Sequence, residues 1–163
     1  MINDISGLKD EKMVDLVLKS GCAICIMHMQ GEPNNMQINP QYHDVVEEVV
    51  RYLENQADKL IKMGHPKELI VIDPGIGFGK NHEHNLSLMK AGKRFKRNNY
   101  SLLWGISRKS VIGIITNKHS PEKRLAGTIG SSVYALDNGV DILRVHDVEE
   151  HNDVFKVLDT LNY

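Results

Sequence analysis

The chain has 163 residues, with 20 basic and 21 acidic side chains and a formal net charge of -1 at pH 7. This balance excludes the strong positive field of nucleic-acid-binding and polybasic membrane-binding surfaces. Hydrophobic residues make up 41% and charged residues 25% of the chain, which indicates a globular protein rather than a disordered one. The apolar runs are far shorter than the roughly 18 residues of a membrane-spanning helix. No secretion signal opens the sequence, so we expect one cytoplasmic domain over 1–163.

Short apolar runs predict five strands. In chain order they cover residues 2–5, 23–28, 69–73, 101–106 and 141–145. Most of these runs are apolar almost throughout, which is typical of strands that are buried on both faces of a parallel sheet.

Amphipathic stretches between these runs predict helices. In chain order they cover residues 9–20, 41–64, 83–97, 108–116, 120–138 and 149–161. The clearest is 41–64, where Asn39-Pro40 predicts the start and Gly64 predicts the end. Gly127 and Gly130 lower the helix propensity of 120–138, so we expect a close backbone approach at these glycines.

The alternation of strands and helices predicts a parallel α/β fold. The strands start about 35 residues apart, so eight such units would need about 280 residues, close to the roughly 250 of a (β/α)₈ barrel. Five units are present, and the sequence begins inside a predicted strand. We therefore expect a partial barrel of about five βα units that lacks its N-terminal part.

Polar residues stand at the end of each predicted strand. They are Asn3-Asp4, 27–31 (MHMQG), 73–80 (DPGIGFGK), 105–110 (GISRKS) and 144–147 (RVHD). In parallel α/β folds, ligands bind at the carboxyl ends of the strands. Solvated loops alone explain five polar strand ends poorly, so we expect one shared binding site.

Asp73 ends a buried strand, where its carboxylate needs hydrogen-bond donors to offset the cost of desolvation. The Asp73-Pro74 pair could instead simply begin a turn. A bound heterocycle with an amino group and a ring N–H would supply the donors. The glycines at 75, 77 and 79 predict a loop with positive φ or a close approach to a ligand, and their spacing is not that of a nucleotide-binding loop.

Two further segments predict an anion site. Ser107-Arg-Lys-Ser110 opens a helix, where backbone N–H groups and cationic side chains favour a carboxylate or a phosphate. A capped helix with solvated lysines is the alternative. Arg144 and His146 lie two residues apart at a strand end, so we expect them to face the same way. The residues together predict a site for a flat polar ring that bears a phosphate.

Other suggestive motifs carry less weight. Cys22 and Cys25 have the spacing of a redox pair, but they enter a strand rather than a helix, so we expect two buried, reduced thiols. The histidines at 82, 84 and 151 match no specific zinc motif, and we expect them on loops and helix surfaces.

Five strings resemble dihydropteroate synthase in order and in spacing. They are INDISGL at 2–8, MHMQGEPNNMQ at 27–37, DPGIGFGKN at 73–81, GISRKSVIG at 105–113 and RVHDV at 144–148. The resemblance implies a (β/α)₈ TIM barrel, here from about strand four to helix eight. It also implies the folate-pathway transferase that sulfonamides inhibit, which joins 4-aminobenzoate to (7,8-dihydropterin-6-yl)methyl diphosphate and releases pyrophosphate.

The resemblance also implies which residues bind each part of the substrates. They are Asn3, Ile5, Met27, Asp73, Gly105 and Lys109 for the pterin, Phe78, Ser107 and Lys109 for 4-aminobenzoate, and Arg144 and His146 for the diphosphate, with Lys109, Arg144 and His146 as the catalytic group. The resemblance implies a magnesium ion as well. Its protein ligand would lie in the N-terminal part that this chain lacks, so no metal ligand is expected among the residues of this chain. The family further implies a homodimer.

Two alternatives stay open at this point. Five parallel strands cannot close a barrel, so the chain could be a non-catalytic pterin-binding fragment that completes its barrel with another chain. A pterin domain of the methyltetrahydrofolate methyltransferase type would also place Asp and Asn on a pterin. The strings around Ser107 and Arg144 disfavour it, because a methyl donor needs no diphosphate site.

Overall fold

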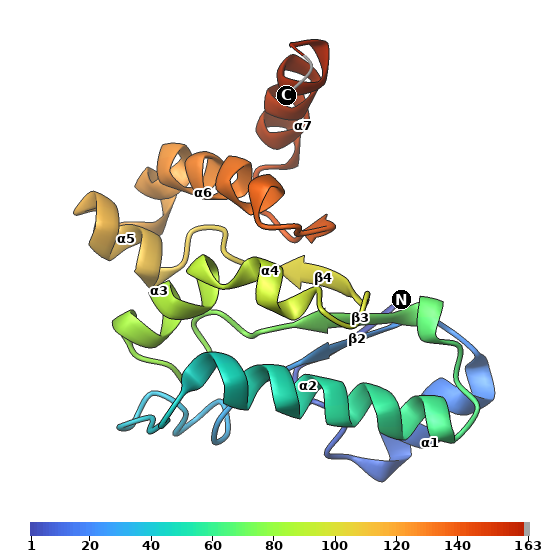
Figure 1. Ribbon diagram of the computed structural model, residues 1–163. Helices are drawn as coiled ribbons and strands as arrows, with labels where there is room; N and C mark the ends of the chain where they lie inside the picture. The colour runs from blue at the N-terminus through green and yellow to red at the C-terminus, as the bar shows by residue number, and fades with distance from the viewer. Residues whose placement is uncertain (162–163) are drawn as a thin grey trace.

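The computed structural model describes residues 1–161, and its centre is a five-stranded parallel sheet with the strand order β1-β2-β3-β4-β5 (Figure 1). The strands are β1 (Ile2–Asp4), β2 (Ile24–Met27), β3 (Ile70–Asp73), β4 (Ser101–Trp104) and β5 (Ile142–Leu143). Each strand pairs with the next one in the sequence. The predicted α/β class and the five predicted strands are confirmed.

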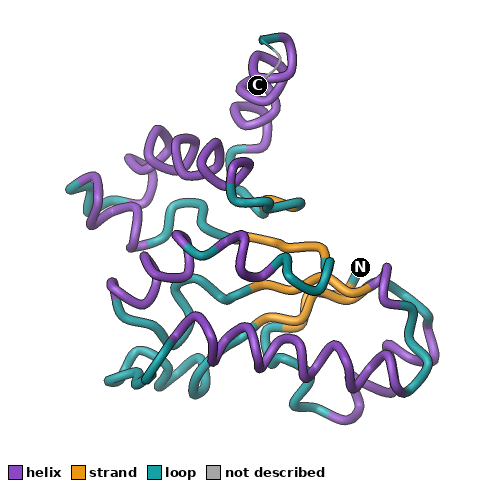
Figure 2. The backbone as a smooth tube through the Cα atoms, viewed as in Figure 1, coloured by secondary structure: helices purple, strands orange, loops and turns teal. Residues whose placement is uncertain are grey.

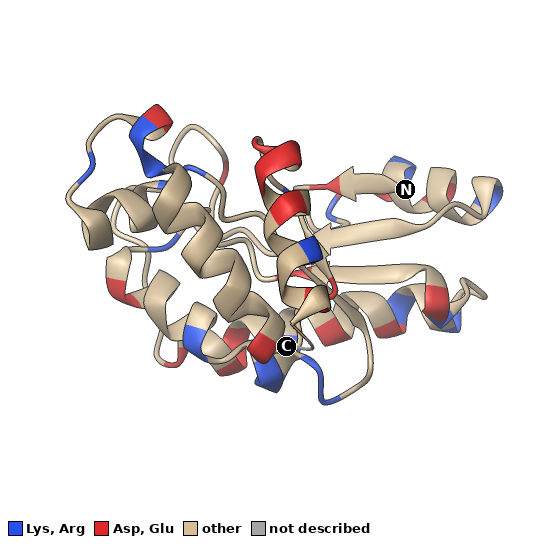
Figure 3. Ribbon diagram, turned by 90° about the horizontal axis from the view of Figure 1, so that it is seen from above, with Lys and Arg blue, Asp and Glu red and all other residues tan. Residues whose placement is uncertain are grey.

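Helices follow each strand and lie outside the sheet (Figure 2). They are α1 (Glu11–Ser20), α2 (Val45–Lys62), α3 (His82–Lys90), α4 (Gly92–Phe95), α5 (Ser110–Thr116), α6 (Leu125–Asp137) and α7 (Val148–Thr160), with 3₁₀ turns at Lys67–Leu69 and Pro121–Arg124. Basic and acidic residues are interspersed along them, as the net charge indicates (Figure 3). No helix within residues 1–161 is long and apolar enough to cross a bilayer.

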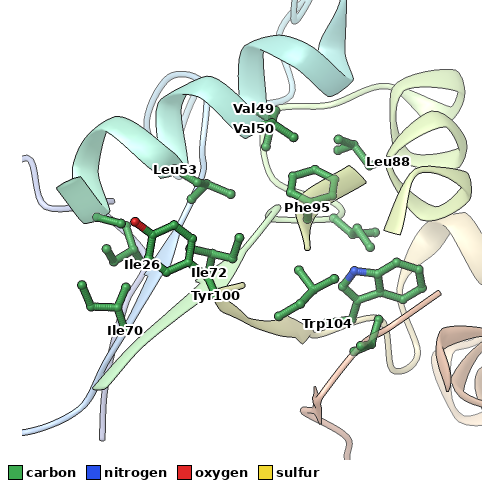
Figure 4. Packing of buried hydrophobic residues seen from close by; sticks show 14 of the residues in the cluster. Ile26, Val49, Val50, Leu53, Ile70, Ile72, Leu88, Phe95, Tyr100 and Trp104 are labelled. Carbon is green, nitrogen blue, oxygen red and sulfur yellow. The ribbon is translucent and has the colours of Figure 1, made fainter. Parts of the chain in front are cut away.

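The main apolar core fills the space between the sheet and the helices. Leu53 of α2 packs over Ile26 and Ile72 of the central strands, and Trp104 and Phe95 extend the cluster toward α3 and α4 (Figure 4). All five side chains are at most 2% exposed. Their burial supplies the hydrophobic stabilisation that holds the helical layer against the sheet.

A second apolar cluster lies on the opposite face of the sheet. It consists of Cys25, Val71 and Leu103, with Ile142 packed against them, so β2 to β5 contribute one residue each. Because side chains alternate along a strand, the residue two positions further on has the same facing. Those residues are Met27, Asp73, Gly105 and Arg144, so the small cluster is the layer beneath the predicted site.

Both cysteines are reduced, as expected. Cys25 is fully buried, and burial raises the pKa of its thiol to about 12. Cys22 lies just before β2 and is only partly buried, so the prediction of two buried thiols holds for Cys25 alone.

Three predicted helices differ from the structure, and the one expected over 120–138 consists of a 3₁₀ turn at Pro121–Arg124 followed by α6. The prediction that a helix begins after Asn39-Pro40 is wrong, because α2 begins at Val45 and the Asp44 carboxylate accepts hydrogen bonds from the amides of Val46 and Glu47. The predicted helix 83–97 is interrupted at Ala91, which ends α3 and precedes α4. The late start of α2 follows from the Asp44 cap, which competes with the apolar periodicity, whereas Ala91 makes no side-chain cap hydrogen bond.

The helical glycines of α6 behave differently from one another. A side chain at Gly127 would meet Ile112 and Thr116 of α5 at 2.7 and 2.9 Å, which confirms the predicted close approach. Gly130 has open space around it, so the same prediction is wrong there.

A close contact at Gly92, the first residue of α4, generates a stability prediction. A Cβ at Gly92 would lie 2.6 Å from Asn138 Cβ and 2.8 Å from the Asn138 carbonyl oxygen. Gly92→Ala should therefore lower the free energy of unfolding by about 1–3 kcal/mol through overpacking. Urea unfolding followed by circular dichroism measures the change.

Gly130→Ala is the matched control, because nothing lies within 4 Å of the added Cβ and Ala has the higher helix propensity. It should leave the free energy of unfolding unchanged or raise it by up to about 1 kcal/mol. Equal losses for both variants would mean that the Asn138 contact is not the cause.

Candidate functional site

The curvature of the sheet brings the two outermost strands together at their carboxyl ends. Four spacings of about 4.8 Å would put β1 and β5 about 19 Å apart in a flat sheet, beyond the reach of one side chain. Arg144 Nη1, after β5, nevertheless donates a hydrogen bond to Asn3 Oδ1 of β1 at 2.9 Å. The strand ends therefore form the rim of a concave surface.

Asp73 lies on this concave surface at the end of β3 and is 1% exposed. The Gly75 amide donates to its Oδ1 at 2.7 Å, and Arg144 Nη2 lies 3.9 Å from its Oδ2. Burial raises the pKa of the Asp73 carboxyl, while the Gly75 amide and the nearby Lys109 and Arg144 cations act in the opposite direction. The carboxylate can thus accept further hydrogen bonds from a ligand that lies on the sheet.

The glycine-rich loop after β3 has the predicted backbone, with positive φ at Gly75, Gly77 and Gly79. A Cβ at Gly75 would lie 1.9 Å from the His28 carbonyl oxygen, so the loop packs directly on the backbone that follows β2. This packing fixes Phe78 at the edge of the concave surface.

Lys109 reaches this loop from the segment after β4. Its Nζ donates to the Ile76 carbonyl oxygen and lies 4.4 Å from the centroid of the Phe78 ring. Burial lowers the pKa of Lys109 to about 8. The ammonium and the aromatic ring form a cation–π contact, and Lys109 stands between Phe78 and Asp73.

Ser107 and His146 meet at the other end of the rim. Ser107 Oγ lies 2.9 Å from His146 Nδ1 and accepts a hydrogen bond from the His146 amide at 3.2 Å. Gly105 lies nearby, where a Cβ would be 2.6 Å from Arg144 Nη2. The loops after β4 and β5 are therefore joined through side chains from both.

The predicted apolar residues differ in exposure. Ile5 follows β1 and is 40% exposed, so it offers an apolar surface beside Asn3. Met27 has no exposed surface and lies beside Asp73, its partner in the β2–β3 register. The structure thus brings the predicted polar residues to one rim, with the buried Met27 next to Asp73.

Lys80 ends the predicted polar segment 73–80 but is not among the predicted site residues. Its ammonium is buried and donates to the carbonyl oxygens of Phe78 at 2.9 Å and Gly75 at 3.1 Å. It also lies 3.0 Å from His28 Nδ1, and burial together with Lys80 lowers the pKa of His28 to about 3. The neutral imidazole is thus the acceptor. The burial of this lysine is not predictable from the sequence, because His28, which it contacts, comes from the loop after β2.

The histidines outside the rim have structural contacts. His84 completes a capping box with Asn81 at the start of α3. His151 is buried, with Nε2 3.1 Å from Ser132 Oγ, so its predicted surface position is wrong. Within residues 1–161 no three His, Cys, Asp or Glu side chains come together as a possible metal site.

Comparison with known proteins agrees with this arrangement. The family profile described as pterin binding enzyme matches residues 1–146. The dihydropteroate synthase of Neisseria meningitidis serogroup C is 42% identical over 163 residues, which are 99% of this chain and 58% of that protein.

Two solved structures of dihydropteroate synthase from Thermus thermophilus are similar, each with a TM-score of 0.93 and 39% identity. One is a complex with 6HMPPP and the other a complex with 4-aminobenzoate. They match 99% of this chain, which spans 64% and 65% of those chains. The chain thus covers only part of the length of its relatives, and the predicted partial TIM barrel is confirmed. It belongs to the pterin binding enzyme family, and within that family it is similar to the dihydropteroate synthases.

Proposed function

We propose that this chain carries the pterin, 4-aminobenzoate and diphosphate sites of a dihydropteroate synthase. The reaction joins 4-aminobenzoate to (7,8-dihydropterin-6-yl)methyl diphosphate and releases pyrophosphate. The observation that carries the proposal is the meeting of Asn3, Asp73 and Arg144 on one concave surface. The proposed pterin-binding domain is 1–163, of which 162–163 lie outside the described residues.

The pterin would lie on the concave face of the sheet. Its amino group and ring N–H groups would donate to Asp73 and Asn3, whose oxygens already face this surface. Gly105 has no side chain, and the space over it holds the Arg144 guanidinium, so the ring would lie close to β4 only when Arg144 turns to the diphosphate. Ile5 would supply an apolar edge. The buried Asp73 carboxylate favours a ligand that offers matching donors, because an unmatched buried carboxylate is costly.

The 4-aminobenzoate would bind between Phe78 and Ser107. The Phe78 ring offers an aromatic face, and Ser107 Oγ offers a hydrogen bond to the carboxylate. Lys109 lies between the two substrates, so its ammonium can serve both the pterin carbonyl and the aminobenzoate side. The role of Lys109 is therefore to orient the two reactants by charge and hydrogen bonding.

Arg144 and His146 would hold the diphosphate and are, with Lys109, the proposed catalytic group. Departure of pyrophosphate breaks the bond to the exocyclic methylene, and the electron-rich pterin delocalises the positive charge that remains. Cationic side chains stabilise the leaving group as its negative charge increases. The neutral aromatic amine then attacks the methylene, so no side-chain nucleophile is required.

Magnesium and a second copy of the chain belong to the proposal through the family resemblance. The described residues form no acidic or histidine cluster that fits a metal ion, so no step here depends on one. The homodimer is compatible with α7, which projects from the sheet (Figure 1) and exposes Val157 and Leu161 by 57% and 71%.

Calorimetric titration of the purified chain with a 7,8-dihydropterin diphosphate analogue, in magnesium-containing buffer, tests the proposal. Binding with a dissociation constant on the order of micromolar is expected, since the polar groups are already in place. Turnover with 4-aminobenzoate is then measured by product formation. Absence of binding by a chain that circular dichroism shows to be folded would contradict the proposal.

Asp73→Asn should weaken pterin binding by about 1–3 kcal/mol, because it replaces a buried acceptor oxygen by a donor. Calorimetry with the bare pterin measures the loss. Asp153→Asn on α7, which changes the charge equally at an exposed position, is the control and should have no effect. Unchanged affinity in Asp73→Asn would remove this residue from the site.

Arg144→Ala should weaken a diphosphate-bearing pterin about tenfold or more, and the bare pterin less, because charge-assisted hydrogen bonds to the anion are lost. The two titrations are compared in the variant and in the parent chain. Arg51→Ala, at an exposed position of α2, controls for net charge. Equal losses for the two ligands would refute the anion-binding role.

A further inference from the structure

Arg108 lies between two residues of the proposed site and has an unusual backbone conformation. Its φ of 58° is in the left-handed region, which residues other than glycine and asparagine rarely adopt. The Arg108 amide donates to Thr128 Oγ1 at 3.1 Å, and its carbonyl oxygen accepts from Arg124 Nη1 at 2.8 Å. The turn is therefore anchored on α6 and on the 3₁₀ turn before it, with Ser107 on one side and Lys109 on the other.

The side chain of Arg108 is held by Asp147, the residue after His146. Arg108 Nε donates to Asp147 Oδ2 at 3.1 Å, and Nη2 donates to Oδ1, so the pair is bidentate. The Asp147 side chain is 11% exposed, and its hydrogen bonds with Arg108 lower the pKa of its carboxyl. A planar, two-point contact of this kind fixes orientation as well as distance.

The same contact explains a missing helix cap. Asp147 occupies the N-cap position of α7, where aspartate usually accepts a hydrogen bond from the first turn, yet it makes no such bond. Asp10 and Asp44 do cap α1 and α2 in this chain. The carboxylate of Asp147 is thus directed to Arg108 instead of to its own helix.

The neighbouring residues repeat the connection. Ser107 contacts His146 through two hydrogen-bonding contacts, so two consecutive residues after β4 meet two consecutive residues after β5. β5 has only two residues in the ladder, and α7 extends away from the sheet (Figure 1). The segment between them therefore depends on these side-chain contacts for its position.

We propose that Arg108 is a positioning residue whose ion pair with Asp147 fixes the loop that carries His146 against the loop that carries Ser107 and Lys109. This role rests on the proposed function in that it sets the distance between the diphosphate and aminobenzoate sites. The Arg108 side chain is directed to Asp147, so the proposal assigns it no substrate contact.

Amide hydrogen exchange of the whole chain without ligand tests the positioning directly. The His146 amide is the reporter, because it donates to Ser107 Oγ, and the Arg144 amide, which donates to the Trp104 carbonyl oxygen, is the internal reference. Arg108→Gly suits the left-handed backbone and so preserves the fold. It should speed exchange at His146 by about tenfold with little change at Arg144.

Further variants separate the ion pair from general destabilisation. Asp147→Asn should have the same effect as Arg108→Gly, and the double variant should add little to either, because both remove one interaction. Arg108→Lys should recover part of the protection. Arg97→Gly, which removes a similar Arg–carboxylate pair between the turn after α4 and Glu54 of α2, is the control and should leave His146 unchanged.

Titration with inorganic pyrophosphate provides the functional readout. Affinity should fall about fivefold in Arg108→Gly and Asp147→Asn, at an unchanged melting temperature, and recover partly in Arg108→Lys. Unaltered exchange at His146 in both single variants, or an equal change in Arg97→Gly, would overturn the proposal. If the parent chain binds no pyrophosphate, the proposed function fails, and the exchange data alone decide the role of Arg108.

Discussion

The curvature of the parallel sheet is the constraint on which the site depends. Strands are tied to their neighbours at a spacing of about 4.8 Å, so only a curved sheet can bring the first and the fifth strand within the length of one arginine. The hydrogen bond between Asn3 and Arg144 shows that the ends of these two strands lie close together. The small cluster of Cys25, Val71 and Leu103 fills the inside of the curve and supports the polar rim above it.

The buried Asp73 and the two buried lysines near it partly offset one another's pKa shifts. Burial alone would raise the pKa of Asp73 and lower that of Lys109 and Lys80, and each group opposes the shift of its oppositely charged neighbour. Burying such charges costs free energy unless they are hydrogen-bonded. The loops supply these hydrogen bonds through the amide of Gly75 and the carbonyl oxygens of Ile76 and Phe78. The same arrangement leaves charge preorganised for a polar ring and an anion.

Much of the architecture was predictable because its signals are local. The three central strands, β2 to β4, are mostly apolar and buried, a pattern that few other elements show, and the positive φ values of the loop after β3 follow from its glycines. The start of α2 was not predictable, because Asn39-Pro40 and Asp44 are both good start signals. The hydrogen bonds between Gln30 and the backbone of Gln41 hold the first of these segments outside the helix.

The sequence by itself determined the fold class, the strand-end location of the polar residues and the resemblance to dihydropteroate synthase, since these depend on residue type and spacing along the chain. Only the tertiary structure decided that Lys80 is buried against His28 of another loop, that Met27 lies fully buried beside Asp73, and that Asp147 contacts Arg108 rather than capping α7. Each of these facts depends on backbone groups or side chains that are distant in sequence. The physical reason is that the burial of a side chain and its hydrogen-bond partners depend on groups that folding brings together. The order of residues along the chain does not specify these groups.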